Sequence, residues 1–339
     1  MGDVVKSVLG GGWGLVVGWI LPVFLAAQGF AYVIARLAFV DLSEEFEGLT
    51  WASQQLALLA VAAVLGLVLA AAQAPLYRVL EGYYLGWPWL VERRTNAHRA
   101  RRTRLLATYE TSTAAGQAVR AGLAYERAAR YPADETQFAP TQLGNAIRRF
   151  ETYARNRYLL DSQLLWHRLK GVAPQSAVDA ITTARANVDF FVALLYGAVV
   201  LVVGAVVGLV VTGDPLLWLA AAGSVLVIVG AYRLAVLATD EWAATECAMV
   251  DLARVKLAEA YGVTIPDDLA DERAMWRVIC TFVRRPYTYS ELKDVPALLT
   301  RYRTAPANDT SEPAASPTTW AELARALGRA ISAVRLPRD

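Results

Sequence analysis

The stretch FFVALLYGAVVLVVGAVVGLVVTGDPLLWLAAAGSVLVIVGAYRLAVLA, residues 190–238, decides the fold. It contains two apolar runs, 190–212 and 216–238, and a helix needs about 20 such residues to cross the hydrocarbon core of a bilayer. Only Gly213-Asp214-Pro215 separates the two runs, which leaves room for nothing but a tight turn. These residues therefore predict a transmembrane helical hairpin.

A second pair of long apolar runs, 13–39 and 55–80, lies in the N-terminal part of the chain. The whole chain is 56% hydrophobic and only 19% charged, whereas soluble domains carry about 25% charged residues. The first run is much longer than the roughly 7–15 apolar residues of a cleaved signal peptide. Because no stretch alternates with the period of a strand, the sequence predicts an all-α polytopic membrane protein with two transmembrane helical hairpins, residues 13–85 and 190–238.

The distribution of charge predicts the orientation of the spans. Lys and Arg collect on the cytoplasmic side of a membrane, and the stretch 86–188 is rich in arginine from Arg93 onward. The loop 41–54 is acidic and contains neither Lys nor Arg. We therefore expect both termini in the cytoplasm, with the loop 41–54 and the turn 213–215 outside.

The remaining segments are predicted to be helical and cytoplasmic. Residues 90–131 contain no proline and predict one long helix, whereas residues 132–140 break the pattern. Residues 176–187 lead into the third span, and 240–261 continue the fourth. We thus expect the inner ends of both hairpins to extend into a cytoplasmic helical bundle formed by residues 86–189 and 239–303.

The two ends of the chain form separate segments. Residues 1–12 are an expected cytoplasmic N-terminus, and 304–318 contain three prolines typical of a flexible linker. Residues 319–336 predict an amphipathic helix that binds the anionic inner leaflet or a groove on a protein. Its apolar face is formed by Trp320, Leu323, Leu327, Ile331 and Val334.

Small and polar residues within the spans are candidates for helix packing. The pattern Gly204-x-x-x-Gly208 allows two helices to approach closely, either within one chain or between two copies. The full set of packing candidates is Gly197, Gly204, Gly208, Gly223 and Gly230. Gln28 and Gln73 are the intramembrane polar candidates, and Arg36 is expected to reach the acidic outer loop.

The inner ends of the second and fourth spans share a pattern. In each, a Tyr-Arg pair is followed by a tryptophan nine residues after the arginine. The pattern favours either a parallel repeat of the two hairpins or the general preference of these residues for the membrane interface. The predicted inner-interface anchors are Tyr77, Arg78, Trp87, Tyr232, Arg233 and Trp242.

Motifs that carry chemistry are absent from the sequence. His98 and His167 lie outside any zinc-binding pattern, and the glycines of residues 10–14 precede a span, so they form no phosphate loop. Cys247 and Cys280 have no partner at ligand spacing. We therefore predict no catalytic residue, no cofactor and no metal site, and we assign the arginines after residue 93 to anionic lipid and not to nucleic acid.

The segment PTQLGNAIRRFETYARNRYLLDSQLLWHRL, residues 140–169, resembles part of four-span membrane proteins of high-GC Gram-positive bacteria with no known activity. The resemblance implies a cytoplasmic helical element between two hairpins and location in a bacterial plasma membrane. Within the segment, Gly144 can allow a turn and Asn145 can cap the helix that follows.

Two functions are compatible with this sequence. The first is a non-enzymatic interaction or sensor module, anchored in the membrane, whose cytoplasmic bundle binds a protein partner. The second is a homo-oligomeric ion channel with a cytoplasmic vestibule, because helices that run unbroken out of the membrane can couple a bundle to a gate. The first is favoured because no span has an obvious polar stripe for a pore.

Overall fold

The computed structural model describes residues 12–84, 86–285 and 300–303, apart from the side chains of residues 41 and 42. Within these ranges the chain is helical, and the β-pairing is limited to an isolated bridge between Val263 and Arg303. Four of the helices are long and apolar enough to cross a membrane. The predicted all-α class is thus confirmed, whereas the predicted linker 304–318 and amphipathic helix 319–336 lie outside the described residues.

The first apolar run forms one helix with two π-helical turns. Its segments are α2 (Trp13–Leu15), η2 (Val16–Ile20), α3 (Leu21–Gly29), η3 (Phe30–Ala35) and α4 (Arg36–Ala38). A short helix, α5 (Val40–Glu47), follows within the predicted outer loop. As expected, Arg36 reaches this loop: its Nε lies 2.8 Å from a carboxylate oxygen of Glu47.

The second apolar run is divided into two helices. The first helix, α6 (Trp51–Ala71), packs against α3, and the second, α7 (Gln73–Glu81), begins after Ala72. Pro75 lies in the first turn of α7, where its missing N–H removes no helical hydrogen bond. The predicted continuous span 55–80 is therefore interrupted at Ala72.

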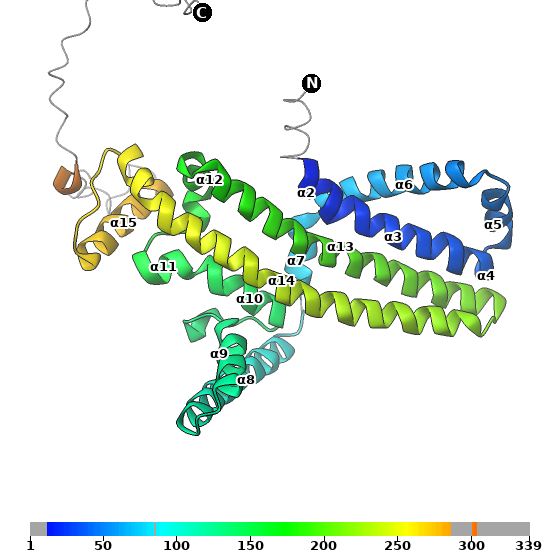
Figure 1. Cartoon of the computed structure of the whole chain (residues 1–339), viewed down its shortest axis with the longest axis horizontal. Helices are drawn as coiled ribbons and strands as arrows, with labels where there is room; N and C mark the ends of the chain where they lie inside the picture. Colours follow the sequence, from blue (N-terminus) through cyan, green and yellow to red (C-terminus); the bar gives the residue numbers. More distant parts are fainter. Residues whose placement is uncertain (1–11, 85, 286–299, 304–339) are drawn as a thin grey trace, which may run out of the picture.

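The two longest helices lie side by side along the molecule (Figure 1). They are α13 (Gln175–Thr212) and α14 (Leu216–Ala260), with 38 and 45 residues. At about 1.5 Å per residue each is roughly twice as long as the hydrocarbon core is thick. Both therefore continue well beyond the apolar layer, as predicted for residues 176–187 and 240–261.

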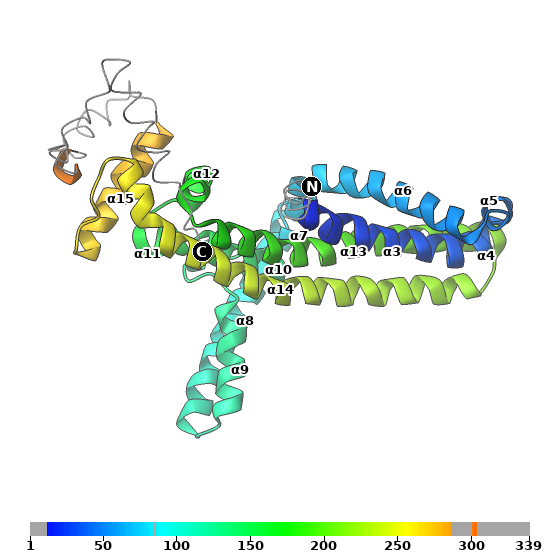
Figure 2. The same ribbon diagram turned by 45° about the horizontal axis from the view of Figure 1, so that its top comes forward.

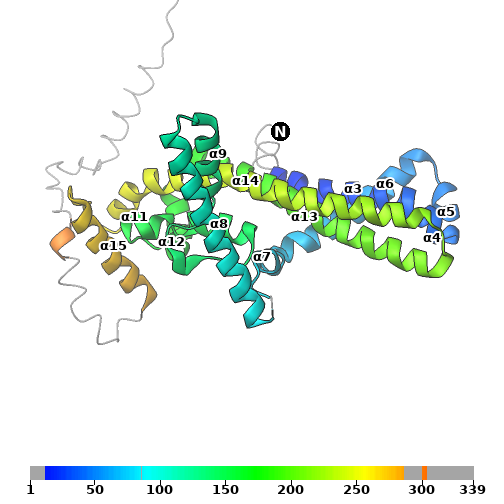
Figure 3. The same cartoon turned by 90° about the horizontal axis from the view of Figure 1, so that it is seen from below.

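A pair of helices projects from the body, and we call it the arm. It consists of α8 (Pro88–Ala114) and α9 (Ala118–Ala129), which run antiparallel and cross the long axis of α13 and α14 (Figures 2 and 3). The prediction of one helix over 90–131 is wrong, because the chain reverses at Gly116, which has a φ of +70°. Glycine adopts this left-handed conformation at little cost, and the absence of proline gave no sign of the turn.

The other helices surround the ends of α13 and α14 that lie away from the spans. They are α10 (Gln142–Glu151), α11 (Tyr153–Tyr158), α12 (Ser162–Val172) and α15 (Leu269–Arg284), with the 3-10 turn η4 (Glu135–Gln137) before α10. Leu165 and Leu169 of α12, Met249 of α14 and Met275 and Trp276 of α15 are fully buried in their common core.

The cap of α10 differs from the prediction. Thr141 caps the helix, since its Oγ1 accepts a hydrogen bond of 3.0 Å from the N–H of Gly144. Asn145 lies one turn further on, fully buried, and its amide donates to the carbonyl oxygens of Ala139 and Thr141. Gly144 lies in the helix, where a Cβ atom would come within 2.8 Å of the Glu81 carbonyl oxygen, so it permits α10 to pack on the end of α7.

Candidate functional site

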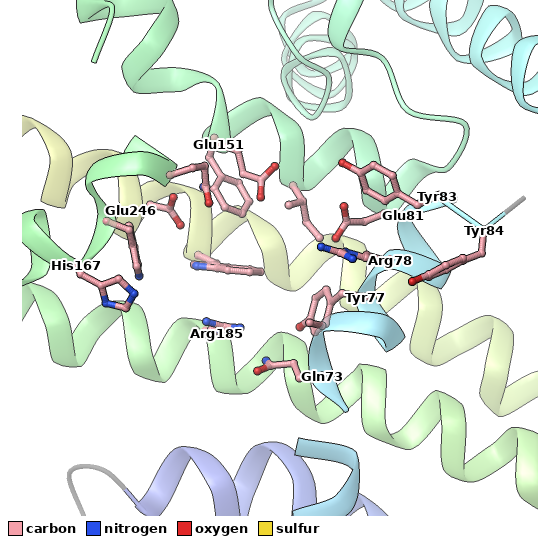
Figure 4. Close-up of a pocket in the computed structure, with 16 residues that line it drawn as sticks. Gln73, Tyr77, Arg78, Glu81, Tyr83, Tyr84, Glu151, His167, Arg185 and Glu246 are labelled. Atoms are coloured by element: carbon pink, nitrogen blue, oxygen red, sulfur yellow. The ribbon is translucent and has the colours of Figure 1, made fainter. Parts of the chain in front are cut away.

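A polar cavity of about 780 Å³ lies where the predicted inner ends of the spans meet the helices beyond them (Figure 4). Its walls come from α7, the loop after it, α10, α12, α13 and α14. The lining side chains are Gln73, Ala74, Tyr77, Arg78, Glu81, Tyr83, Tyr84, Ile147, Phe150, Glu151, Gln163, Trp166, His167, Arg185, Trp242 and Glu246.

Three carboxyl groups from three helices face this cavity. Glu81 ends α7, Glu151 ends α10, and Glu246 lies on α14 beyond the apolar part of that helix. Glu246 is only 4% exposed, and it forms no salt bridge with any described residue. A carboxyl this deeply buried, with no salt bridge at contact distance, favours the neutral form.

Burial and the charge of Glu151 raise the affinity of the other two carboxyls for protons. Burial, followed by the negative charge of Glu151, raises the pKa of Glu81 to about 7 and that of Glu246 to about 8. Burial likewise raises the pKa of Glu151. The opposing cations are Arg78 and Arg148 near Glu81 and Arg185 near Glu246. The cavity thus holds carboxyls that titrate near neutral pH.

Arg185 and Trp242 form the wall beside Glu246. The guanidinium carbon of Arg185 lies 5.5 Å from the centre of a Trp242 ring, a cation–π arrangement. Nε of Arg185 is buried without a hydrogen-bond partner. This donor is available to a molecule or a water that enters the cavity.

Asp189 lies directly behind two side chains of the cavity wall. Its Oδ1 accepts hydrogen bonds from Nε2 of Gln73 at 2.9 Å and from the hydroxyl of Tyr77 at 2.7 Å, and the residue is 6% exposed. Sequence reasoning missed it because the apolar run was taken to begin at residue 190. The available signal was Arg185 four residues earlier, since that spacing places both charges on one face of a helix.

The other predicted intramembrane residue, Gln28, lies far from this cavity. Its Nε2 donates to Oε1 of Gln55 at 3.1 Å, and Gln55 in turn donates to the hydroxyl of Tyr32. This network joins the first span to α6 near the predicted outer end. Gln28 and Gln73 therefore belong to two separate polar clusters.

The two predicted sets of inner anchors make different contacts. Tyr77 packs edge-on against Trp242 with ring centres 6.4 Å apart, so members of both sets meet at the cavity. Trp87 is 65% exposed at the start of the arm. Tyr232 accepts a hydrogen bond from the N–H of Leu143 at the start of α10.

The predicted packing glycines divide into two groups. A Cβ atom at Gly197, Gly204 or Gly208 would contact Ala26, Phe30 or Ala38 of the first span, respectively. At Gly223 and Gly230 a Cβ atom would meet open space. The Gly204–Gly208 face is therefore covered within a single chain.

Comparison with known proteins indicates no activity for this chain. It matches no protein-family model, and no curated protein or solved structure is significantly similar to it. Within the described ranges, no three His, Cys, Asp or Glu side chains are grouped closely enough to hold a metal ion. The raised pKa values of Glu81 and Glu246 allow the cavity to take up and release protons near neutral pH.

Proposed function

We propose that the protein is a non-enzymatic sensor module, anchored in the membrane, in which protonation of the cavity carboxyls controls how the cytoplasmic helices pack on the spans. One observation carries the proposal: α7, α10, α12, α13 and α14 all contribute to the wall of a single polar cavity. A change of charge in this cavity acts on the spans and on the cytoplasmic helices together. The arm begins shortly after α7, so it leaves the body from the same junction.

The direction of the response follows from the raised pKa values. At pH 6 the carboxyls of Glu81 and Glu246 are mainly protonated, so they are not repelled by the negative charge of Glu151. As pH rises through about 7 and 8, these groups ionise beside Glu151. Because the ordinary pKa of a glutamate is 4.5, the unfolded chain ionises earlier, and the free energy of unfolding falls as pH rises toward 8.

A pair of spin labels across the cavity tests this response. One label replaces Val79 of α7 and the other replaces Arg168 of α12, both exposed, in a chain whose two cysteines are replaced by alanine. We expect the distance between the labels, measured by pulsed electron resonance in nanodiscs, to be longer at pH 9 than at pH 6. Glu246→Gln should shorten the distance at pH 9, because an amide stays neutral.

The matched control is Glu259→Gln, an exposed glutamate on the same helix, α14. It should leave the pH response unchanged. Equal distances at pH 6 and pH 9, or the same pH response in the Glu246→Gln chain as in the original one, would show that the cavity is not a proton sensor.

The ion channel remains the second candidate function. The polar clusters around Gln28 and Asp189 are hydrogen-bonded within the chain. A cavity of about 650 Å³ beside the first span, α6 and α13 has an almost wholly apolar lining, so a conducting path would have to form between copies. The symmetry of detergent-solubilised particles separates the two functions. A closed ring with an axial opening favours the channel, whereas a monomer or compact dimer favours the sensor module.

A further inference from the structure

A second cleft, of about 410 Å³, is lined by four arginines from three helices. Arg101 comes from α8, Arg127 and Arg130 come from the end of α9, and Arg233 comes from α14. Gln142 at the start of α10 adds a neutral polar group, and none of the described residues that line the cleft is acidic. We call it the arginine cleft.

Most of the positive charge in the arginine cleft is not neutralised. Arg130 binds the carboxylates of Asp240 and Glu126, with N–O distances of 2.6 and 2.5 Å. Among the described residues, no salt bridge involves Arg101, Arg127 or Arg233. An anion entering the cleft would meet three guanidinium groups that are free to donate charge-assisted hydrogen bonds.

The neighbouring histidine reports the same excess of positive charge. The pKa of His98 lies below its ordinary value, first because of burial and then because of the positive charges of Arg101 and Arg94. A protonated histidine is thus disfavoured beside the cleft, as expected where the local potential is already positive.

The position of Arg233 relates the cleft to the membrane. Leu226, Val229, Arg233 and Leu237 are separated by three or four residues, so they lie on one face of α14. The three apolar residues are 73%, 45% and 48% exposed, in that order. This face is an apolar stripe that runs along the fourth span and reaches the arginine cleft at the predicted inner surface.

We propose that the arginine cleft binds the phosphate headgroup of an anionic phospholipid from the inner leaflet, with an acyl chain lying along the exposed stripe of α14. The positive charge selects the phosphate, and the adjoining stripe selects a ligand with an apolar tail. The lipid would contact both α14 and the arm, because Arg101 and Arg127 belong to α8 and α9. It would therefore hold the base of the arm at the membrane surface. This inference is independent of the proton-sensing cavity.

The experiment is a titration of the full chain in non-ionic detergent with phosphatidylglycerol, followed by the rise in unfolding temperature. The test variant carries Arg101→Gln and Arg127→Gln, and the control carries Arg104→Gln and Arg120→Gln. Both remove one arginine from α8 and one from α9, and all four residues are exposed, but neither Arg104 nor Arg120 lines the cleft. We expect the test variant to bind the lipid about tenfold more weakly or worse, and the control to stay within about twofold.

Parallel titrations identify the ligand. Phosphatidylcholine and free glycerol phosphate should both bind more weakly than phosphatidylglycerol, the first because it has no net negative charge and the second because it has no tail. The proposal is overturned if both double variants lose affinity equally, if phosphatidylcholine binds as tightly, or if glycerol phosphate does. The unfolding temperature without lipid verifies that each variant is folded.

Discussion

At the scale of single residues, the carboxylate of Asp189 connects the third span to α7. Both hydrogen bonds that it accepts come from groups with few alternatives, since Tyr77 is 7% exposed and Gln73 is partly buried. A buried polar group that loses its partner costs about 1–3 kcal/mol, more than a satisfied hydrogen bond contributes. Asp189 thus holds the side chains of Gln73 and Tyr77 in place in the cavity wall.

We predict that Asp189→Leu lowers the free energy of unfolding by about 2–4 kcal/mol, because it leaves two buried donors without an acceptor. Asp189→Asn keeps an acceptor oxygen and should lose less than half as much. Thermal unfolding in detergent measures both effects. The control is Asp179→Leu, an exposed position on the same helix, which should change stability by no more than about 0.5 kcal/mol. Similar losses at residues 189 and 179 would contradict the structural role of Asp189.

At the scale of elements, the third span depends on its glycines for contact with the first. Gly208 lies so close to Ala38 that no side chain fits between them, and Leu217 closes the same space. Gly223, one helix further on, has nothing near it. The same residue type therefore has a packing role on α13 and no visible packing role on α14.

We predict that Gly208→Leu destabilises the protein by about 1–3 kcal/mol or more, since the larger side chain forces the first span away from α13. Gly223→Leu should leave stability unchanged or slightly higher, because leucine favours a helix more than glycine does. Thermal unfolding and size-exclusion chromatography in detergent provide the measurement. If the two variants behave alike, the Gly208 face meets lipid and not the first span.

At the scale of the whole molecule, the spans occupy one end, α11, α12 and α15 occupy the other, and the arm projects sideways between them (Figure 1). The acidic segment around Glu45 and the turn at Asp214 lie together at the far end of the spans, whereas Thr111 lies near the end of α8 in the arm. A membrane around the apolar part would thus separate residues 45 and 214 from residue 111.

We predict that single cysteines replacing Glu45 and Asp214 react with an impermeant thiol reagent in intact cells, in a chain without Cys247 and Cys280. A cysteine replacing Thr111 should react only after the cells are permeabilised. The physical reason is the positive charge of the stretch 86–188, which contains Thr111, because Lys and Arg near the ends of spans keep such a stretch on the cytoplasmic side. Labelling of residue 111 in intact cells would reverse the proposed orientation.

The local pattern of apolar residues determined where most helices of this protein form. The apolar runs and their lengths predicted the four long helices, and the absence of breakers after residues 187 and 240 predicted that α13 and α14 extend beyond the membrane. These features depend on residues close together in the chain, so they can be read from the sequence. The break of the second span at Ala72 and the arm are the exceptions. The turn of the arm depends on one glycine at a positive φ that resembles many other glycines.

Tertiary structure alone decided the two sites. Glu81, Glu151 and Glu246 come from helices far apart in the sequence, and each looks like an ordinary surface glutamate until the helices pack. The same holds for Arg101, Arg127 and Arg233, which meet only where the arm leaves the body beside α14. Burial and the proximity of like charges depend on this long-range packing, and no local pattern of residues encodes them.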